Sequence, residues 1–301
     1  MAEPRRGQEV REARQQPGTG EPVKSGFNEG TTKENSDLET DLRLAEQYGF
    51  DFIEFRLDKI EAFLRTGSLE ELEKKLKGSR IRPHALNAIK GINLMSAAEA
   101  REVFSRLEWA CGIGERLGSP SVVLVPTIRE GLDIDGRREE IDRDCSGVLR
   151  KCSAIAAAHG MGVALEPIGL RDSAVRSLEQ AWRIVQAVGA DNVGLAVDTF
   201  NVHLFDSWKD IEVLRGIPVE RIHVVHIADS EDAPLGRLDQ RNRLWPGDGI
   251  VPIGRVISTL RDMGYDGVVS LELFRPEYWK MSPEEVIRIG SEKTRRMLEA
   301  G

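Results

Sequence analysis

Short β-rich runs alternate with longer amphipathic segments along this chain, and that alternation restricts the fold more than any other feature. Several runs, such as VVLV and VGLAV, are apolar throughout, as in strands covered on both faces of a parallel sheet. Strands that alternate with helices indicate βα units. Eight such runs occur, at residues 23–27, 50–56, 82–89, 121–127, 162–169, 193–200, 222–229 and 267–274.

Eight βα units over roughly 275 residues predict an α/β fold consisting of a single (β/α)8 TIM barrel, whose usual size is about 250 residues. We expect this barrel to occupy residues 23–301. Helices are expected at residues 37–48, 97–117, 139–159 and 177–188. Ser36 is the expected N-cap of the first of these helices, and Ser68 is that of a further helix. Gly118, Gly160 and Gly189 are the expected C-caps of the other three.

A doubly wound open sheet is the main alternative, and it would need a glycine-rich dinucleotide loop between a strand and a helix. The nearest match, GIGERLG at 112–118, has one residue too many and precedes a strand instead of following one. We therefore reject that fold. Residues 1–22 contain no aromatic residue and no apolar run, so we expect a disordered tail outside the barrel.

The composition narrows the classes of partner. The formal net charge is −8, whereas nucleic-acid binding relies on Lys and Arg to neutralise phosphates. No apolar run approaches the ~20 residues of a membrane span, and the three cysteines lack the spacing of a disulfide framework or a thiolate zinc site. We expect a soluble, cytoplasmic protein that binds neither nucleic acid nor membrane. The sequence leaves homo-oligomerisation open.

Four consecutive strands end in a side chain that can bind a metal ion. These side chains are Glu166 in VALEPIG, Asp198 in LAVDTF, His226 in VVHIAD and Glu272 in VSLELF. Their separations of 32, 28 and 46 residues are each about one βα unit, so the four should stand side by side at the C-terminal mouth of the barrel. Carboxylates in such apolar runs are costly unless a metal, a partner charge or protonation compensates them.

Each of these residues alone also has a structural explanation. Asp198 is placed to cap a following helix, and a single histidine is more often a hydrogen-bonded core residue. Four in register on successive strands instead indicate one shared divalent ion. Three carboxylates and one imidazole make a mixed oxygen and nitrogen site that suits Mn²⁺, Co²⁺, Zn²⁺ or Mg²⁺.

The same segments also carry a family resemblance. ALEPIG, VDTFNVH, VHIADSED, RLWPGDG (243–249) and GYDGVVSLELFRPEYW (264–279) resemble the xylose-isomerase-like sugar isomerases and epimerases, over about residues 23–297. Residues 26–60 and PHALNAI (83–89) are most similar to the branch that acts on cyclic keto-polyols of the inosose type. The resemblance implies a metal held by the four residues above, and an activity that moves a carbonyl between neighbouring carbons of a polyol ketone.

Such an isomerisation requires that a weakly acidic C–H proton be removed and a proton returned. A divalent cation that chelates the carbonyl and hydroxyl oxygens would stabilise the enediolate. Two carboxylates on opposite sides of the metal would then act as base and acid. Glu166 and Glu272, at the two ends of the ligand series, are the catalytic candidates, and the sequence does not distinguish which is the base.

Several further residues are candidates for substrate binding. Members of this superfamily often have a histidine three residues after the sixth-strand aspartate, where this chain has Asn201, an amide that hydrogen-bonds but does not titrate. His203 either takes over that role or packs in the loop, and Glu54 and Arg56 either bind hydroxyls or pair with each other. The remaining candidates are His84, Arg243 and Trp245.

Other activities use the same four ligands, notably a dehydratase of the dehydroshikimate type or a ketose epimerase. A DNA-repair endonuclease of the related barrel type would need a histidine-rich zinc cluster and a basic face, which five histidines and a charge of −8 do not favour. A non-catalytic sugar-binding barrel is disfavoured by the two candidate acid–base carboxylates. Residues 236–249 contain glycines and arginines that leave a phosphosugar open, but the resemblance favours an unphosphorylated polyol.

Overall fold

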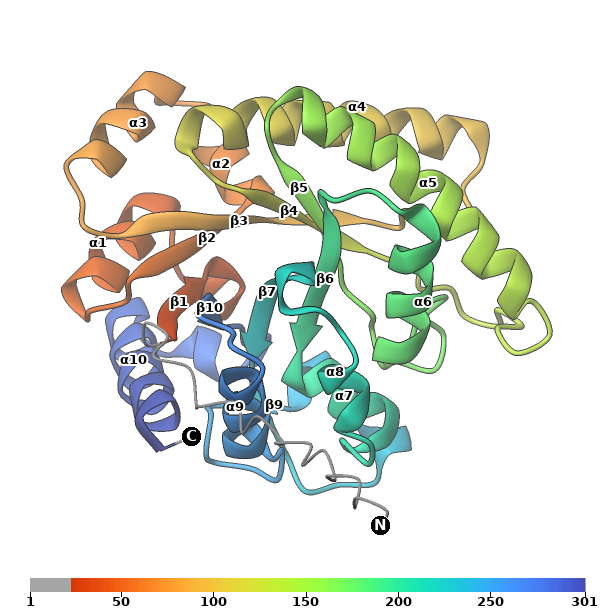
Figure 1. Ribbon diagram of the computed structural model, residues 1–301. Helices are drawn as coiled ribbons and strands as arrows, with labels where there is room; N and C mark the ends of the chain where they lie inside the picture. The colour runs from red at the N-terminus through yellow and green to blue at the C-terminus, as the bar shows by residue number, and fades with distance from the viewer. Residues whose placement is uncertain (1–22, 301) are drawn as a thin grey trace, which may run out of the picture.

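Eight parallel strands close into a barrel in the computed structural model, which describes residues 23–300 (Figure 1). The order around the barrel is β1-β10-β7-β6-β5-β4-β3-β2. Each strand lies within one of the eight expected runs or overlaps it, so the predicted TIM barrel is confirmed. The tail expected at residues 1–22 lies outside the described residues. The strands are β1 (Lys24–Asn28), β2 (Phe52–Arg56), β3 (Arg82–Lys90), β4 (Ser121–Val125), β5 (Gly162–Leu165), β6 (Val193–Asp198), β7 (Ile222–Ile227) and β10 (Val268–Leu271).

Helices surround the barrel (Figure 1). Ser68 forms the expected capping box with Glu71, and Gly118 and Gly189 end their helices in the left-handed conformation. The N-cap expected at Ser36 is wrong, because the neighbouring Asp37 accepts the hydrogen bond from the N–H of Thr40. The helices are α1 (Leu38–Gln47), α2 (Leu57–Phe63), α3 (Leu69–Lys77), α4 (Ala97–Leu117), α5 (Arg138–Ala158), α6 (Leu178–Val188), α7 (Thr199–Asp206), α8 (Glu212–Arg215), α9 (Ile253–Asp262) and α10 (Pro283–Ala300).

The segment between β7 and α9 adds a small antiparallel ribbon that the sequence did not predict. It pairs β8 (Asp229–Ser230) with β9 (Arg243–Leu244). Asp229 anchors the end of this segment, because its carboxylate accepts hydrogen bonds from the N–H groups of Gly247 and Val251. The backbone at Arg243 is therefore held at a defined place above the barrel.

Buried polar side chains accompany the apolar core of the barrel. Apolar residues from β3 to β7 form a buried cluster separate from the main core. Fully buried polar groups include Asn28, Glu54 and His226. Buried polar groups need partners, so a functional site is expected where they gather. Among the described residues, no helix has the length and apolar character needed to cross a membrane.

Candidate metal centre

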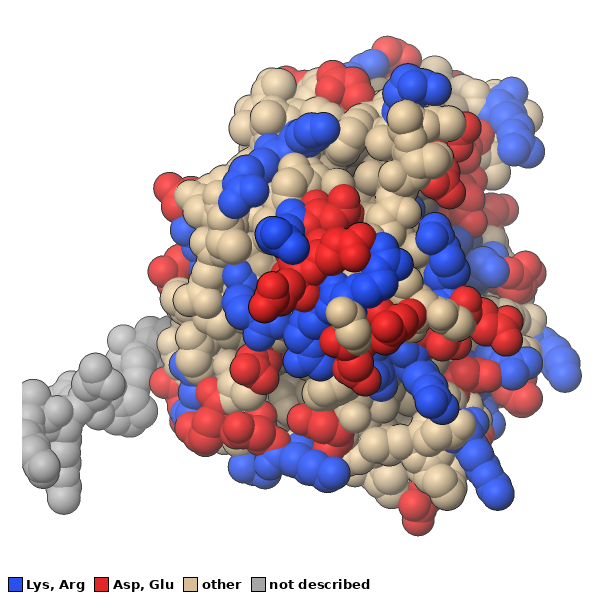
Figure 2. Space-filling view, turned by 90° about the vertical axis from the view of Figure 1, so that its right-hand side faces the viewer, with Lys and Arg blue, Asp and Glu red and all other residues tan. Residues whose placement is uncertain are grey.

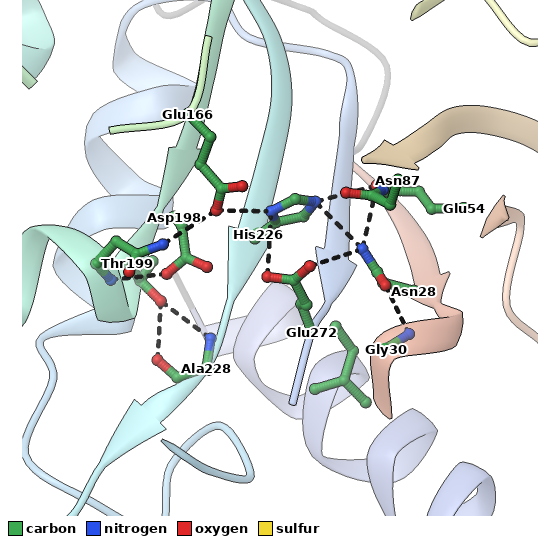
Figure 3. A network of polar contacts seen from close by, with 12 residues as sticks. Asn28, Gly30, Glu54, Asn87, Glu166, Asp198, Thr199, His226, Ala228 and Glu272 are labelled. Atoms are coloured by element: carbon green, nitrogen blue, oxygen red, sulfur yellow. Dashed lines mark hydrogen bonds and ion pairs between the residues drawn. The ribbon is translucent and has the colours of Figure 1, made fainter. Parts of the chain in front are cut away.

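The four strand-end residues converge at the C-terminal mouth of the barrel. Each offers one ligand atom, and these atoms all lie within 4.8 Å of one another (Figure 3). All four residues are buried, with at most 4% of their surface exposed. The parallel register produces this convergence, because β6 and β7 pair Asp198 with His226. The residues are Glu166, Asp198, His226 and Glu272.

Asp198 also caps a helix. One carboxylate oxygen accepts a hydrogen bond of 2.8 Å from the N–H of Asn201 and caps α7. The hydroxyl of Thr199 donates to the carbonyl of Ala228 at 2.8 Å and accepts from its N–H at 3.0 Å, which ties the start of α7 to β7. The helix-capping and metal-binding interpretations of Asp198 are therefore compatible, and the cap fixes the carboxylate in place.

The two ring nitrogens of His226 face different groups. Its Nε2 lies 3.0 Å from Oε2 of Glu54, which accepts because an ionised carboxylate has no proton to donate. Its Nδ1 is buried, has no hydrogen-bond partner among the described residues, and lies 3.5 Å from both Glu166 and Glu272 (Figure 3). A buried nitrogen without a partner and two carboxylates that face it together form a set of ligand atoms that suits a divalent cation, so these residues fit a metal ion.

Glu54 is held by two further donors. Nδ2 of Asn87 lies 2.5 Å from its Oε2, and Nδ2 of Asn28 lies 3.3 Å from the same oxygen. Burial would raise the pKa of Glu54, but the charge and hydrogen bond of His226 outweigh burial and lower it to about 2. Glu54 is therefore an ionised, buried partner of His226.

The cluster concentrates negative charge. Burial raises the pKa of Glu272 to about 8, and although His226 opposes this effect, the charge of Glu166 adds to it. Nδ2 of Asn28 donates to Oε1 of Glu272 at 3.0 Å. A site in which burial and like charges keep protons bound is one where a cation can replace them.

Arg243 supplies the nearest fixed positive charge. Its Nη1 donates to Oδ2 of Asp198 at 2.7 Å and lies 3.3 Å from Oε2 of Glu272. Arg243 is 1% exposed, and its guanidinium carbon lies over the rings of Phe200 and Phe274, at 4.9 and 5.1 Å from their centroids. Arg243 thus contacts two of the candidate ligands directly.

A cavity of about 540 Å³ opens beside the cluster. Of the predicted site residues, the cavity is lined by Arg56, Glu166, Asn201, Arg243 and Glu272. Sequence reasoning missed other lining residues, of which the most distinctive are Gln240 and Trp279. Both lie in or beside segments that the sequence analysis named, since Gln240 is near Arg243 and Trp279 ends SLELFRPEYW. This proximity is the feature of the sequence that could have pointed to them.

The other predicted substrate-binding residues lie away from this lining. Trp245 stacks on Tyr278 with ring centroids 3.6 Å apart. His203 is buried in α7, and neither ring nitrogen has a partner among residues 23–300. His84 is buried against the edge of Phe52, at 5.9 Å between ring centroids. Arg56, which does line the cavity, pairs with Asp58 at 2.7 Å, and no pairing with Glu54 is found among the described residues.

Charges on the surface are mixed. On the face that Figure 2 shows, Lys and Arg side chains are interspersed with Asp and Glu side chains. Many of the basic residues are paired, as Arg241 is with Asp239 and Arg275 with Glu231. This distribution differs from the continuous basic stripe that marks nucleic-acid binding.

Comparison with known proteins agrees with this geometry. A family model for xylose isomerase-like TIM barrels matches residues 42–297. A protein of Bacillus velezensis named inosose isomerase is 40% identical over 273 residues, which is 90% of this chain and 96% of that protein. An inosose isomerase of Bacillus subtilis strain 168 is 38% identical over the same length, with 90% and 96% covered.

A solved structure shows the same fold. The crystal structure of the IolI protein with a bound zinc atom has a TM-score of 0.88 and 37% identity, and the match covers 92% of this chain and 98% of that one. The family predicted from the sequence motifs is therefore confirmed. The chain belongs to the xylose isomerase-like TIM barrel family.

Proposed function

We propose that this protein is a divalent-metal-dependent isomerase that moves a carbonyl between adjacent carbons of an inosose-type keto-polyol. The observation that carries the proposal is the buried cluster of three carboxylates around the unpartnered Nδ1 of His226. The relatives named inosose isomerase, and the zinc atom of the IolI structure, support the choice of substrate and the presence of a metal.

The metal would be held by Glu166, Asp198, His226 and Glu272, and we extend the proposal to Mn²⁺, Co²⁺, Zn²⁺ or Mg²⁺. When bound, it would stabilise negative charge on the substrate oxygens as the C–H proton leaves. Glu166 and Glu272 both line the cavity, so their carboxylates can reach a substrate there. One removes the proton from the hydroxyl-bearing carbon, and the other delivers a proton to the former carbonyl carbon, while the hydroxyl proton passes to the former carbonyl oxygen.

The cavity suits a polyol ring. Its lining includes the amides of Asn87, Asn201 and Gln240, which can both donate to and accept from hydroxyls. It also includes Ile168 and Phe274, against which the C–H face of a ring can pack. The lining therefore offers both kinds of contact that a cyclic polyol makes.

The decisive experiment follows the reaction in D₂O. The purified protein with added Mn²⁺ or Zn²⁺ is incubated with scyllo-inosose, and the products are followed by NMR. An isomerase moves the carbonyl to the neighbouring carbon and incorporates solvent deuterium at the exchanged position, without loss of water. Loss of water identifies a dehydratase, and inversion of a carbinol without carbonyl migration identifies an epimerase.

Two controls accompany this experiment. Glu272→Gln keeps the shape of the side chain and removes one catalytic carboxylate and one metal ligand, so activity should fall by at least about a hundredfold. Treatment with a chelator should abolish activity, and added metal should restore it. Full activity in metal-free protein contradicts the proposal.

A further inference from the structure

A continuous chain of hydrogen bonds connects Arg243 to Glu166. Nε and Nη2 of Arg243 donate to Oε1 of Gln240 at 3.0 and 2.6 Å. Nε2 of Gln240 donates to Oδ1 of Asn201 at 2.7 Å. Nδ2 of Asn201 donates to Oε1 of Glu166 at 3.0 Å.

The chemistry of the first member determines the direction of every bond in this chain. A guanidinium only donates, so Gln240 must present its oxygen to Arg243 and its NH₂ group to the other side. Asn201 therefore receives a donor, presents its oxygen to Gln240, and presents its own NH₂ group to Glu166. The two amides thus have one orientation, and both donate toward the carboxylate.

The first member of the chain is buried and held by several contacts. Arg243 lies in β9, is 1% exposed, and contacts the rings of Phe200 and Phe274. Gln240 begins a short 3-10 helix whose N-cap, Asp239, accepts from the N–H of Arg241 at 2.8 Å. The side chains of this one segment contact Asp198 and Glu272 directly and Glu166 through Asn201.

We infer that Gln240 is a positioning residue. Because its side-chain oxygen accepts from Arg243, its NH₂ group donates to Asn201, and the Asn201 amide in turn orients the Glu166 carboxylate in the cavity. The inference rests on the proposed function only in naming Glu166 as a catalytic residue and a ligand. Oε1 of Glu166 accepts from Asn201 and also lies 3.5 Å from Nδ1 of His226, so this hydrogen bond holds in place the oxygen that faces the imidazole.

Gln240→Glu tests the direction of the chain, because the new carboxylate has almost the same shape but only accepts. It keeps the contact with Arg243, but Asn201 must turn its NH₂ group toward it and its carbonyl oxygen toward Glu166. That oxygen repels the carboxylate. Gln240→Leu removes the connection without reversing it. Gln240→Glu should therefore be the more damaging variant, although it is the smaller chemical change.

The first measurement is metal affinity, by competition between metal-free protein and a zinc chelator. We expect Gln240→Glu to weaken zinc binding by about 10–100-fold, as for other residues that orient a metal ligand, and Gln240→Leu to weaken it less. Gln47→Glu is the matched control, because Gln47 is exposed in α1 and also accepts from an arginine, Arg43. It should leave the affinity unchanged.

The second measurement needs neither metal nor substrate. In ¹⁵N-labelled, metal-free protein, the side-chain NH₂ resonances of Asn201 should shift in Gln240→Glu and in Glu166→Gln, and stay unchanged in Gln47→Glu. Unchanged Asn201 resonances in Gln240→Glu would overturn the inference, as would a Gln240→Leu variant that binds zinc more weakly than Gln240→Glu. A wild-type protein that binds no metal contradicts the proposed function alone, since the resonance shifts still test the hydrogen-bond chain.

Discussion

Replacing Glu54 should weaken metal binding although its carboxylate is not one of the four candidate ligands. All its hydrogen-bond donors converge on one oxygen, since Nε2 of His226 and the amides of Asn28 and Asn87 all point to Oε2. Oε1 accepts no hydrogen bond from the described residues. Glu54→Gln can therefore keep every contact by placing its amide oxygen at the Oε2 position, and it removes only the negative charge.

The expected magnitude follows from the role of Glu54 behind a metal-binding histidine. Residues that orient and polarise such a histidine contribute about 10–100-fold to metal affinity, or roughly 1.4–2.7 kcal/mol. Glu54→Gln should lie near the lower limit, because the geometry is retained. Glu54→Ala should lie near the upper limit and also lower the free energy of unfolding by about 1–3 kcal/mol for each donor left without a partner.

Competition with a zinc chelator measures the affinity, and thermal unfolding of metal-free protein shows whether each variant folds. Glu29→Gln is the matched control: Glu29 is also fully buried beside the end of a barrel strand, and its Oε2 accepts from the N–H of Arg56 at 2.7 Å. Its burial raises its pKa to about 8, so a neutral side chain there changes little. A folded Glu54→Ala variant that binds zinc within twofold of wild type would refute the reasoning.

Three further predictions concern stability. Lys59→Met should destabilise the fold by about 3–5 kcal/mol in urea unfolding, because it leaves the buried carboxylate of Asp41, 2.5 Å from the lysine, without a counter-charge. Adding Asp41→Asn should recover part of this stability, and no recovery would contradict the explanation. His159 hydrogen-bonds two α4 glutamates that raise its pKa. Its contribution to the free energy of unfolding, up to about 1 kcal/mol, should be complete below about pH 6.5 and disappear as the pH rises through its folded-state pKa. The stability of His159→Gln should thus differ from that of wild type at low pH and not at pH ~9. Ser96→Ala removes the capping box of α4 and should cost about 1 kcal/mol in the same urea assay, whereas an unchanged midpoint would mean that the cap contributes nothing.

The barrel could be predicted because its signals are local. An apolar run followed by an amphipathic run shows a βα unit wherever it occurs, and the helix expected at 97–117 matches α4 because a cap residue stands at each end. The error at Ser36 arose where two adjacent residues are both good caps. Only the backbone conformation decides that Asp37, and not Ser36, reaches the free N–H of Thr40.

The four candidate ligands could also be predicted, because each marks the end of its own strand and the barrel aligns those ends. The supporting contacts of these ligands could not, although Glu54 was predicted as a substrate-binding residue. Glu54 lies 172 residues before His226, and only closure of the barrel brings the two side chains together. Gln240 lies in a segment without periodicity, where nothing in the sequence shows that its amide faces Asn201. Strand ends can be read from a sequence, whereas contacts across a barrel depend on its closure.

Charge balance explains why this arrangement requires a cation. Among the described residues, Glu54, Glu166, Asp198 and Glu272 are buried carboxylates around His226, and the guanidinium of Arg243 pairs with Asp198 and Glu272. Burial raises the pKa of Glu272, and the charges of Glu166 and Asp198 add to this effect although His226 and Arg243 oppose it. Because protons and a divalent ion compensate the same carboxylates, each competes with the other, and the residues that fix the carboxylates in place determine how well the ion succeeds. Arg243 and Glu54 therefore belong to the metal centre as much as its four candidate ligands do.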